Sequence, residues 1–205
     1  MVKRKARGWA TYNRRIDVLL LCTANQCRSP MAQVLLGHHL RLAGVDATVS
    51  SAGLYPSGAP ATDHAVTVMG ERGLDLTAHE SRRVDASIIG RADLVLGMTR
   101  EHVREVAVAD PAVLARTFTL KELVRAAETS GGRRPNESFE AFLQRMGVGR
   151  RRDTLLGVGH DDAYDVEDPV GRSLHEYERT ADELDDLLGR LVALLWPGHA
   201  AERSA

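Results

Sequence analysis

Apolar residues in this chain form short runs that alternate with longer segments of helical periodicity. The first run, Asp17 to Leu21, is apolar throughout after its first residue, as expected for a parallel strand buried on both faces. Residues 45–51, 92–98 and 117–120 form further strand-like runs. The segments between them repeat apolar residues every three or four positions, and this period predicts helices.

The predicted helices cover 30–42, 63–72, 100–109 and 174–195. Gly44 and Gly73 follow the first two as C-terminal caps. Thr99 is expected to cap the third helix simply, because His102 is not the acidic partner of a capping box. Strands that alternate with such helices predict an α/β fold, a three-layer sandwich with a four-stranded parallel sheet and helices on both faces. Right-handed crossovers place the carboxyl ends of its strands at one edge.

The chain is expected to form one domain, residues 16–196. Residues 1–15 are basic, polar and without periodicity, which predicts a disordered tail, and residues 197–205 are expected to fray. Residues 121–162 interrupt the strand–helix alternation. Two helix-like segments there are joined by a basic glycine-containing turn. They predict a helical insertion beside the edge of the sheet where the carboxyl ends of the strands lie.

The sequence Cys-Thr-Ala-Asn-Gln-Cys-Arg-Ser-Pro follows the first strand, at residues 22–30. Ser29 is the expected helix N-cap, with Pro30 at the first helical position. A loop between a strand end and a helix start gathers backbone N–H groups, and the helix dipole adds about half a positive charge, so this loop is an anion site. Cys22 and Arg28 add a nucleophile and a guanidinium. The loop N–H groups, the helix dipole and Arg28 together favour a reactive thiolate at Cys22, and the same N–H groups and guanidinium can bind the oxygens of a phosphoryl group.

This loop resembles the signature loop of the low molecular weight protein tyrosine phosphatases, and the resemblance covers most of residues 16–120 and 163–195. Arsenate reductases of the thioredoxin-coupled type share that fold and resemble it too. The resemblance implies a cysteinyl-phosphate mechanism, a site without a metal ion or other cofactor, and a general acid from an Asp-Pro loop near the C-terminus.

On this resemblance the expected catalytic residues are Cys22 as nucleophile, Arg28 as the phosphate-binding guanidinium and Asp168, which precedes Pro169, as general acid. The whole loop is expected to bind phosphate. Its residues are Thr23, Ala24, Asn25, Gln26, Cys27, Arg28 and Ser29.

The resemblance also implies a set of residues that hold the loop in shape. These are Asn25, Ser29, Ser51 and His79. Tyr55 lies where the family builds one wall of its substrate cleft, and an aromatic side chain there is suited to stack on a phosphotyrosine ring. Val170 and Gly171 stand where the family often has aromatic residues, which leaves smaller phosphomonoesters open as substrates.

We therefore expect a phosphomonoester hydrolase, a protein-tyrosine phosphatase. One alternative is an arsenate reductase that uses an external low-molecular-weight thiol, because no cysteine follows Cys27 to resolve a thiol intermediate. The other alternative is a phosphate- or phosphoprotein-binding module without turnover. Pro30 agrees with the phosphatase pattern rather than with the reductase.

Composition narrows the setting of this chemistry. A formal net charge of −1 over 205 residues gives no general attraction to nucleic acid or membranes. No run approaches the ~18 apolar residues of a membrane span, and the basic N-terminus lacks the apolar stretch of a signal peptide, so we expect a cytoplasmic protein. The only two cysteines lie in the loop. This excludes a disulfide framework and leaves Cys27 as a redox partner that could silence Cys22 through a reversible bridge.

Overall fold

A four-stranded parallel sheet forms the centre of the computed structural model, which describes residues 15–55, 58–150 and 162–198. Its strands follow the order β2-β1-β3-β4 and comprise Ile16–Cys22 (β1), Ala47–Gly53 (β2), Leu94–Gly97 (β3) and Thr117–Thr119 (β4). The predicted parallel sheet is confirmed. Because β1 lies between β2 and β3, the loop after it has a strand on either side.

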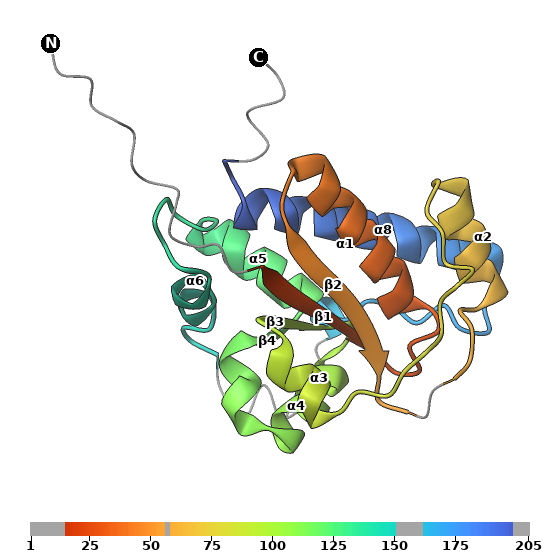
Figure 1. Ribbon diagram of the computed structural model, residues 1–205, viewed down its shortest axis with the longest axis horizontal. Coiled ribbons are helices and arrows are strands. Elements are labelled where there is room, and N and C mark those ends of the chain that lie inside the picture. The colour runs from red at the N-terminus through yellow and green to blue at the C-terminus, as the bar shows by residue number, and fades with distance from the viewer. Residues whose placement is uncertain (1–14, 56–57, 151–161, 199–205) are drawn as a thin grey trace, which may run out of the picture.

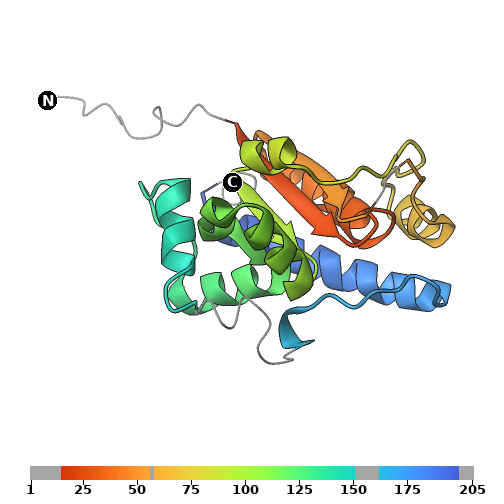
Figure 2. The same ribbon diagram turned by 90° about the horizontal axis from the view of Figure 1, so that it is seen from below.

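Helices cover both faces of the sheet (Figures 1 and 2). They are Arg28–Ala43 (α1), Asp63–Glu71 (α2), Ala86–Arg91 (α3), Arg100–Ala109 (α4), Leu120–Ser130 (α5), Phe139–Met146 (α6) and Leu174–Leu195 (α8), with 3₁₀ turns at Pro111–Arg116 and Asp162–Tyr164. Helices α1, α2, α5 and α8 bury their apolar residues on one side of the sheet, and α3 and α4 bury theirs on the other. This is the predicted three-layer sandwich.

The side chains of β1 explain why its sequence is a continuous apolar run. Val18, Leu20 and Cys22 point into the larger core beneath α1 and α8, whereas Leu19 and Leu21 point into the smaller core beneath α3. All five are at most 3% exposed. A strand with both faces buried cannot alternate with polar residues, so the pattern follows from the position of β1 inside the sheet.

The predicted start of the first helix is wrong. Helix α1 begins at Arg28 with Cys27 in the N-cap position, so Ser29 is not the cap and Pro30 is the third helical residue. The Ser29 hydroxyl is bound instead to the side chains of Cys22 and Asn25, which is a tertiary arrangement that local capping signals do not contain. The predicted end is confirmed, because Gly44 adopts a left-handed φ of 68°.

Within the predicted insertion, both expected helices are present as α5 and α6. The expected location is wrong for α6, which shares a groove with Ile16 and Asp93 at the amino-terminal ends of β1 and β3. That end is opposite the carboxyl edge of the sheet, and Figure 1 shows α6 far from the end of β1. Buried apolar residues on α6, Phe142 and Leu143 among them, attach it there to the larger core. Residues 151–161 lie outside the described part of the chain.

Helix α3 was not predicted, since its six residues are too few for a helical period to show in the sequence. The expected disordered tail and frayed end lie outside the described residues except for 15 and 197–198.

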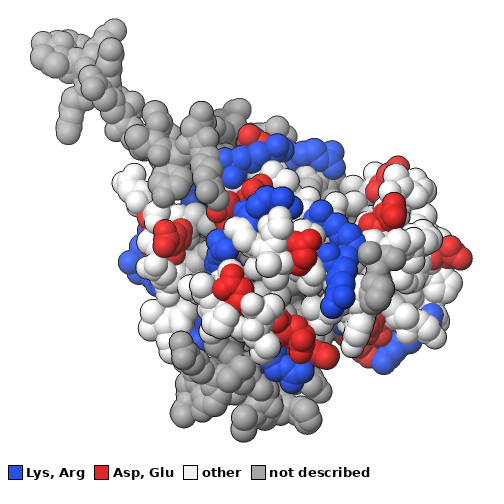
Figure 3. Space-filling view, turned by 60° about the horizontal axis from the view of Figure 1, so that its bottom comes forward, with Lys and Arg blue, Asp and Glu red and all other residues white. Residues whose placement is uncertain are grey.

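None of the described helices is long and apolar enough to span a membrane. On the face shown in Figure 3, basic and acidic side chains are interspersed in several separate groups.

Replacing Leu20 tests the central position of β1. We expect Leu20→Ala to lower the free energy of unfolding by about 2–5 kcal/mol, because Leu20 is 0% exposed and its removal leaves a cavity. The matched control is Leu42→Ala in α1, where the side chain is 53% exposed and the change should stay within about 0.5 kcal/mol. Urea unfolding of both variants measures the difference, and equal effects would contradict the described core.

Candidate active site

The loop between β1 and α1 bends sharply at Asn25. This residue has a φ of 56°, in the left-handed region that residues other than glycine rarely adopt. Its side-chain nitrogen donates hydrogen bonds to Ser29 Oγ at 3.0 Å and Ser51 Oγ at 2.8 Å. Its side-chain oxygen accepts from the backbone N–H of Arg82 at 3.0 Å, and its carbonyl accepts from His79 Nε2 at 2.7 Å. The four residues expected to support the loop are therefore brought together, and Arg82 joins them.

Backbone contacts hold the rest of the loop from outside. The carbonyl of Thr23 accepts from the N–H groups of Leu54 and Tyr55, at 2.9 and 3.2 Å. The carbonyl of Gln26 accepts from Thr62 N–H at 2.9 Å. These two carbonyls therefore face outward, toward the segments that follow β2. The N–H of a planar trans peptide points opposite to its carbonyl, so the N–H groups of Ala24 and Cys27 face the interior of the loop, as an anion site requires.

Gly53, at the end of β2, lies directly against this loop. A Cβ atom built on Gly53 would come within 2.8 Å of the carbonyl carbon of Ala24 and of the backbone nitrogen of Asn25, and within 2.9 Å of the carbonyl oxygen of Thr23. These atoms belong to the backbone and cannot swing aside. The close approach of β2 to the loop therefore requires glycine at this position.

The two cysteines differ in their surroundings. Cys22, the last residue of β1, is 3% exposed, and its Sγ atom lies 3.0 Å from Ser29 Oγ. When Cys22 is a thiolate, the hydroxyl must be the donor, because a thiolate carries no hydrogen. Burial raises the pKa of the Cys27 thiol, and the nearby Cys22 and Asp168 raise it further. Cys27 therefore stays a protonated thiol, while a donor is in place for a Cys22 thiolate.

Arg28 is almost completely buried beside the loop. Its Nη1 atom donates to the carbonyl of Val166 at 3.1 Å, and Nη2 donates to Thr23 Oγ1 at 3.2 Å and to Asp168 Oδ2 at 2.5 Å. The Nε atom is buried and has no hydrogen-bond partner among the described residues. A buried donor without a partner is costly, so the geometry calls for an acceptor oxygen at this position. A phosphoryl group supplies such an oxygen.

Asp168 reaches Arg28 from 140 residues further along the chain. Its segment is fixed to the sheet by Val166 N–H, which donates to the carbonyl of Met98 at 2.8 Å. A second anchor is Lys121 Nζ, which donates to the carbonyl of Asp165 at 2.6 Å. Asp168 itself is held by Arg28 through Oδ2 and by Val170 N–H through Oδ1, the latter at 3.2 Å. Cys22, Arg28 and Asp168 are thus assembled at one place, as the sequence analysis expected.

A cleft that borders this site is rich in acidic side chains. The cleft that contains Arg28 and Asp168 runs along the beginning of α8. Its acidic residues are Asp165, Glu167, Asp168, Glu176, Asp182 and Glu183, and its basic residues are Arg28, Lys121 and Arg179. Tyr55 lies at the other side of the loop, with its backbone bonded to Thr23 and its side chain 56% exposed. Among the described residues, no group of three or more His, Cys, Asp and Glu side chains is placed to hold a metal ion.

His102 is the residue that the sequence analysis missed. It lies at the start of α4, is 1% exposed, and its Nε2 atom lies 3.2 Å from Thr23 Oγ1. The expected simple cap at Thr99 is wrong, because His102 completes a capping box by accepting from Thr99 N–H at 2.9 Å. Its imidazole accepts the hydrogen bond that an acidic side chain usually accepts in a capping box. The sequence pattern alone does not reveal this substitution of acceptor.

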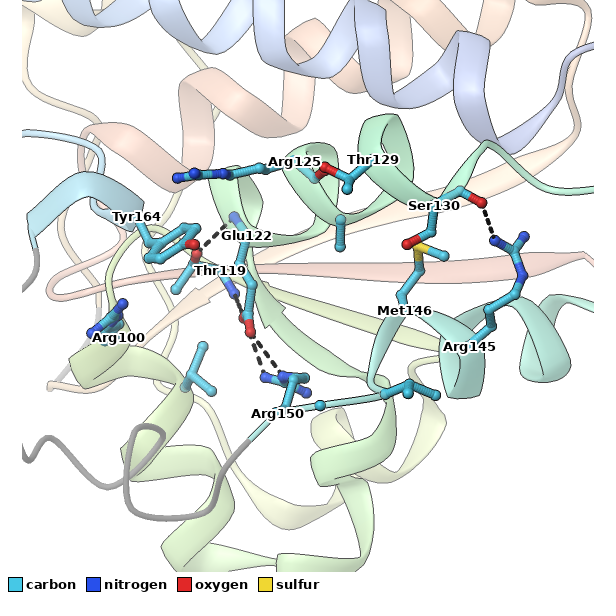
Figure 4. Close-up of a pocket in the computed structure, with 14 residues that line it drawn as sticks. Arg100, Thr119, Glu122, Arg125, Thr129, Ser130, Arg145, Met146, Arg150 and Tyr164 are labelled. Carbon is cyan, nitrogen blue, oxygen red and sulfur yellow. Dashed lines mark hydrogen bonds and ion pairs between the residues drawn. The ribbon is translucent and has the colours of Figure 1, made fainter.

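A separate pocket between α4, α5 and α6 is drawn in Figure 4. It contains none of Cys22, Arg28 and Asp168. Two of its four arginines serve the fold: Arg145 is paired with Glu137, and Arg150 with Glu122. The pocket is therefore distinct from the candidate active site.

Adding a methyl group at Gly53 tests the close approach of β2 to the loop. We expect Gly53→Ala to weaken the binding of inorganic phosphate at least ~10-fold, because displacing the loop by a fraction of an ångström misaligns its N–H groups. The control is Gly37→Ala in α1, where a Cβ atom meets nothing within 4 Å. Isothermal titration calorimetry with inorganic phosphate measures the affinity of both variants and of the wild type. Unchanged binding by Gly53→Ala would show that the loop tolerates the shift.

Comparison with known proteins agrees with this site. A family model described as "Low molecular weight phosphotyrosine protein phosphatase" matches residues 17–134. A protein-arginine-phosphatase of Bacillus subtilis (strain 168) is 31% identical over 181 residues, covering 88% of this chain and 97% of its own length. A probable low molecular weight protein-tyrosine-phosphatase, EpsP, of Ralstonia solanacearum is 37% identical over 132 residues, covering 62% of this chain and 88% of its own length.

A solved structure of the YwlE arginine phosphatase, a mutant with a phosphorylated active site serine, superposes with a TM-score of 0.65. It is 31% identical and covers 86% of this chain and 93% of its own. The family model spans more than half of the chain, and the Bacillus subtilis relative covers 88% of it. The chain belongs to the low molecular weight phosphotyrosine protein phosphatase family.

Proposed function

We propose that this phosphatase hydrolyses phosphorylated protein side chains in two steps, with Cys22 as nucleophile, Arg28 as the phosphate-binding cation and Asp168 as general acid and base. The observation that carries the proposal is the buried Nε donor of Arg28, which lacks a partner among the described residues, in a site that also contains a thiol and a carboxyl group. A dianionic phosphoryl group satisfies that donor.

In the first step, the Cys22 thiolate attacks phosphorus, and the bond to the leaving oxygen or nitrogen breaks. Arg28 and the loop N–H groups stabilise the charge on the three equatorial oxygens. Asp168 gives its proton to the leaving atom. Ser29 stabilises the thiolate before attack, because its hydroxyl lies 3.0 Å from Cys22 Sγ.

In the second step, the Asp168 carboxylate takes a proton from water, and the resulting hydroxide attacks the cysteinyl phosphate. The S–P bond breaks, the thiolate returns and inorganic phosphate leaves. The phosphorylated active site serine in the YwlE mutant supports a phosphorylated nucleophile as the intermediate. We expect Arg28 Nη2, which donates to Asp168 Oδ2 in this structure, to turn to the phosphoryl group when it binds, which frees Asp168 to act on the leaving group.

The substrate side chain that we propose first is phosphotyrosine. Tyr55 supports it, since this exposed aromatic residue follows β2 next to the loop and is suited to stack on a phenyl ring. The exposed Val170 adds no aromatic contact after Asp168. A second candidate is phosphoarginine. It is supported by the relative named as a protein-arginine-phosphatase, which covers 88% of this chain.

The predicted bridge between Cys22 and Cys27 stays a prediction. Both cysteines are free thiols in the structure. Because burial raises the pKa of Cys27, this thiol is a weak attacking group, and Cys22 would be the sulfur that is oxidised first.

Hydrolysis of p-nitrophenyl phosphate without added metal tests the mechanism. We expect turnover by the wild type, none by Cys22→Ser, and a loss of roughly 10²–10⁴ in kcat for Asp168→Asn, which removes the general acid. Asp110→Asn, at the other Asp-Pro pair, is the matched control and should retain full activity. If the wild type does not hydrolyse p-nitrophenyl phosphate but reduces arsenate with a thiol donor, the protein is a reductase. If it only binds phosphate, it is a binding module.

Peptides that carry phosphotyrosine or phosphoarginine test the substrate. We expect Tyr55→Ala to lower kcat/KM for a phosphotyrosine peptide about 2- to 12-fold, the equivalent of an aromatic contact of ~0.5–1.5 kcal/mol. The same variant should leave phosphoarginine hydrolysis unchanged. Val170→Ala serves as the control for loss of apolar surface. If the wild type prefers the phosphoarginine peptide and Tyr55→Ala alters neither activity, the second candidate replaces the first.

A further inference from the structure

The hydrogen bonds around His102 fix which of its nitrogens carries the hydrogen. The backbone N–H of Thr99 can only donate, and it points at His102 Nδ1 at 2.9 Å. Nδ1 must therefore be an acceptor, and in a neutral imidazole the hydrogen then sits on Nε2. It follows that Nε2 donates to Thr23 Oγ1, 3.2 Å away.

Thr23 Oγ1 receives a second donor from the other side. Arg28 Nη2 lies 3.2 Å from it, and a guanidinium has no acceptor. Both lone pairs of the hydroxyl oxygen are thus occupied, one by His102 and one by Arg28. The hydroxyl keeps its own hydrogen, which neither of these two hydrogen bonds uses. Thr23 is the residue after Cys22, so this remaining donor belongs to the site itself.

The surroundings of His102 keep this arrangement in one form. Burial, with the charge of Arg28 adding to it, lowers the pKa of His102 to about 3, so the imidazole is neutral at any pH near neutrality. Gly97 in β3 leaves the space for it, since a Cβ atom there would come within 3.0 Å of His102 Cβ and of the Thr99 carbonyl oxygen. The ring is thus held against a strand that pairs directly with β1.

We propose that His102 is a positioning residue for phosphate binding: its Nε2–H occupies one lone pair of Thr23 Oγ1, Arg28 occupies the other, and the Thr23 hydroxyl hydrogen is donated to the phosphoryl group. This inference rests on the proposed function and adds a side-chain donor to its loop. Arg28 Nη2 bonds both Thr23 and Asp168, so the hydroxyl lies on the Asp168 side of the guanidinium.

Substitution of Thr23 tests the donor. We expect Thr23→Val, which has nearly the same shape, to lower kcat/KM for p-nitrophenyl phosphate at least ~10-fold and to raise the inhibition constant of inorganic phosphate by a similar factor. Thr23→Ser restores the hydroxyl and should recover most of both. Thr117→Val is the matched control, because Thr117 is also buried and its hydroxyl bonds a carbonyl away from the site. Equal values for Thr23→Val and the wild type would overturn the proposal.

A double-mutant cycle tests the route through Thr23. We expect His102→Gln to lower kcat/KM about 3- to 10-fold in the wild type but by less than about twofold in Thr23→Val, since the two residues act as one unit. Equal losses in both backgrounds would show that His102 supports only the structure. Thermal unfolding of each variant separates this effect from loss of stability.

Nuclear magnetic resonance of the histidine nitrogens gives a result that needs no activity. We expect a neutral His102 with hydrogen on Nε2 that does not titrate between about pH 5 and pH 8. Titration in that range, or hydrogen on Nδ1, would overturn the proposal. An inert wild type would instead refute the proposed function. Phosphate binding to Thr23→Val and the imidazole spectrum would still decide whether Thr23 and His102 act as proposed.

Discussion

The bend at Asn25 is the constraint on which the rest of the site depends. Backbone in the left-handed region is unfavourable for a side chain with a Cβ atom, and here three side-chain hydrogen bonds and one to the carbonyl offset that cost. Those bonds reach α1 through Ser29, β2 through Ser51, and the segment that contains His79 and Arg82. A loop that must turn its N–H groups inward has no internal partners, so the surrounding fold has to hold it.

A second requirement is that Arg28 is a buried charge. A guanidinium that is 3% exposed is tolerated only with partners, and these come from Thr23 within the loop and from Val166 and Asp168 far along the chain. The segment that carries Asp168 is tied to β3 and α5, so it completes the site although it lies outside the residues that the family model matches. The larger core under α8, which contains both Cys22 and Val166, thereby holds Cys22 and the segment of Asp168 together.

Much of this arrangement was predictable because it follows from local pattern and topology. A buried strand, a loop and a helix place Cys22 and Arg28 together. The position of Asp168 was expected only from the resemblance of its Asp-Pro pair to the family's loop. The helix start was mispredicted, since the tertiary partners of Ser29 do not appear in its neighbours. His102 was missed because Thr23, its partner, is 79 residues away. The apolar stripe of α6 shows that the helix packs, but does not show at which edge of the sheet.

The ion pair between Arg28 and Asp168 also bears on which ligands can bind. A ligand gains the Nη2 atom of Arg28 only by competing with a carboxylate held at 2.5 Å. Phosphodiesters and sulfate esters carry a single negative charge and compete with that carboxylate on equal terms at best. A phosphoryl group with two charges competes better and also supplies an oxygen for the buried Nε donor. On the proposed mechanism, we therefore expect doubly charged groups to be favoured at the binding step, before any bond to sulfur forms.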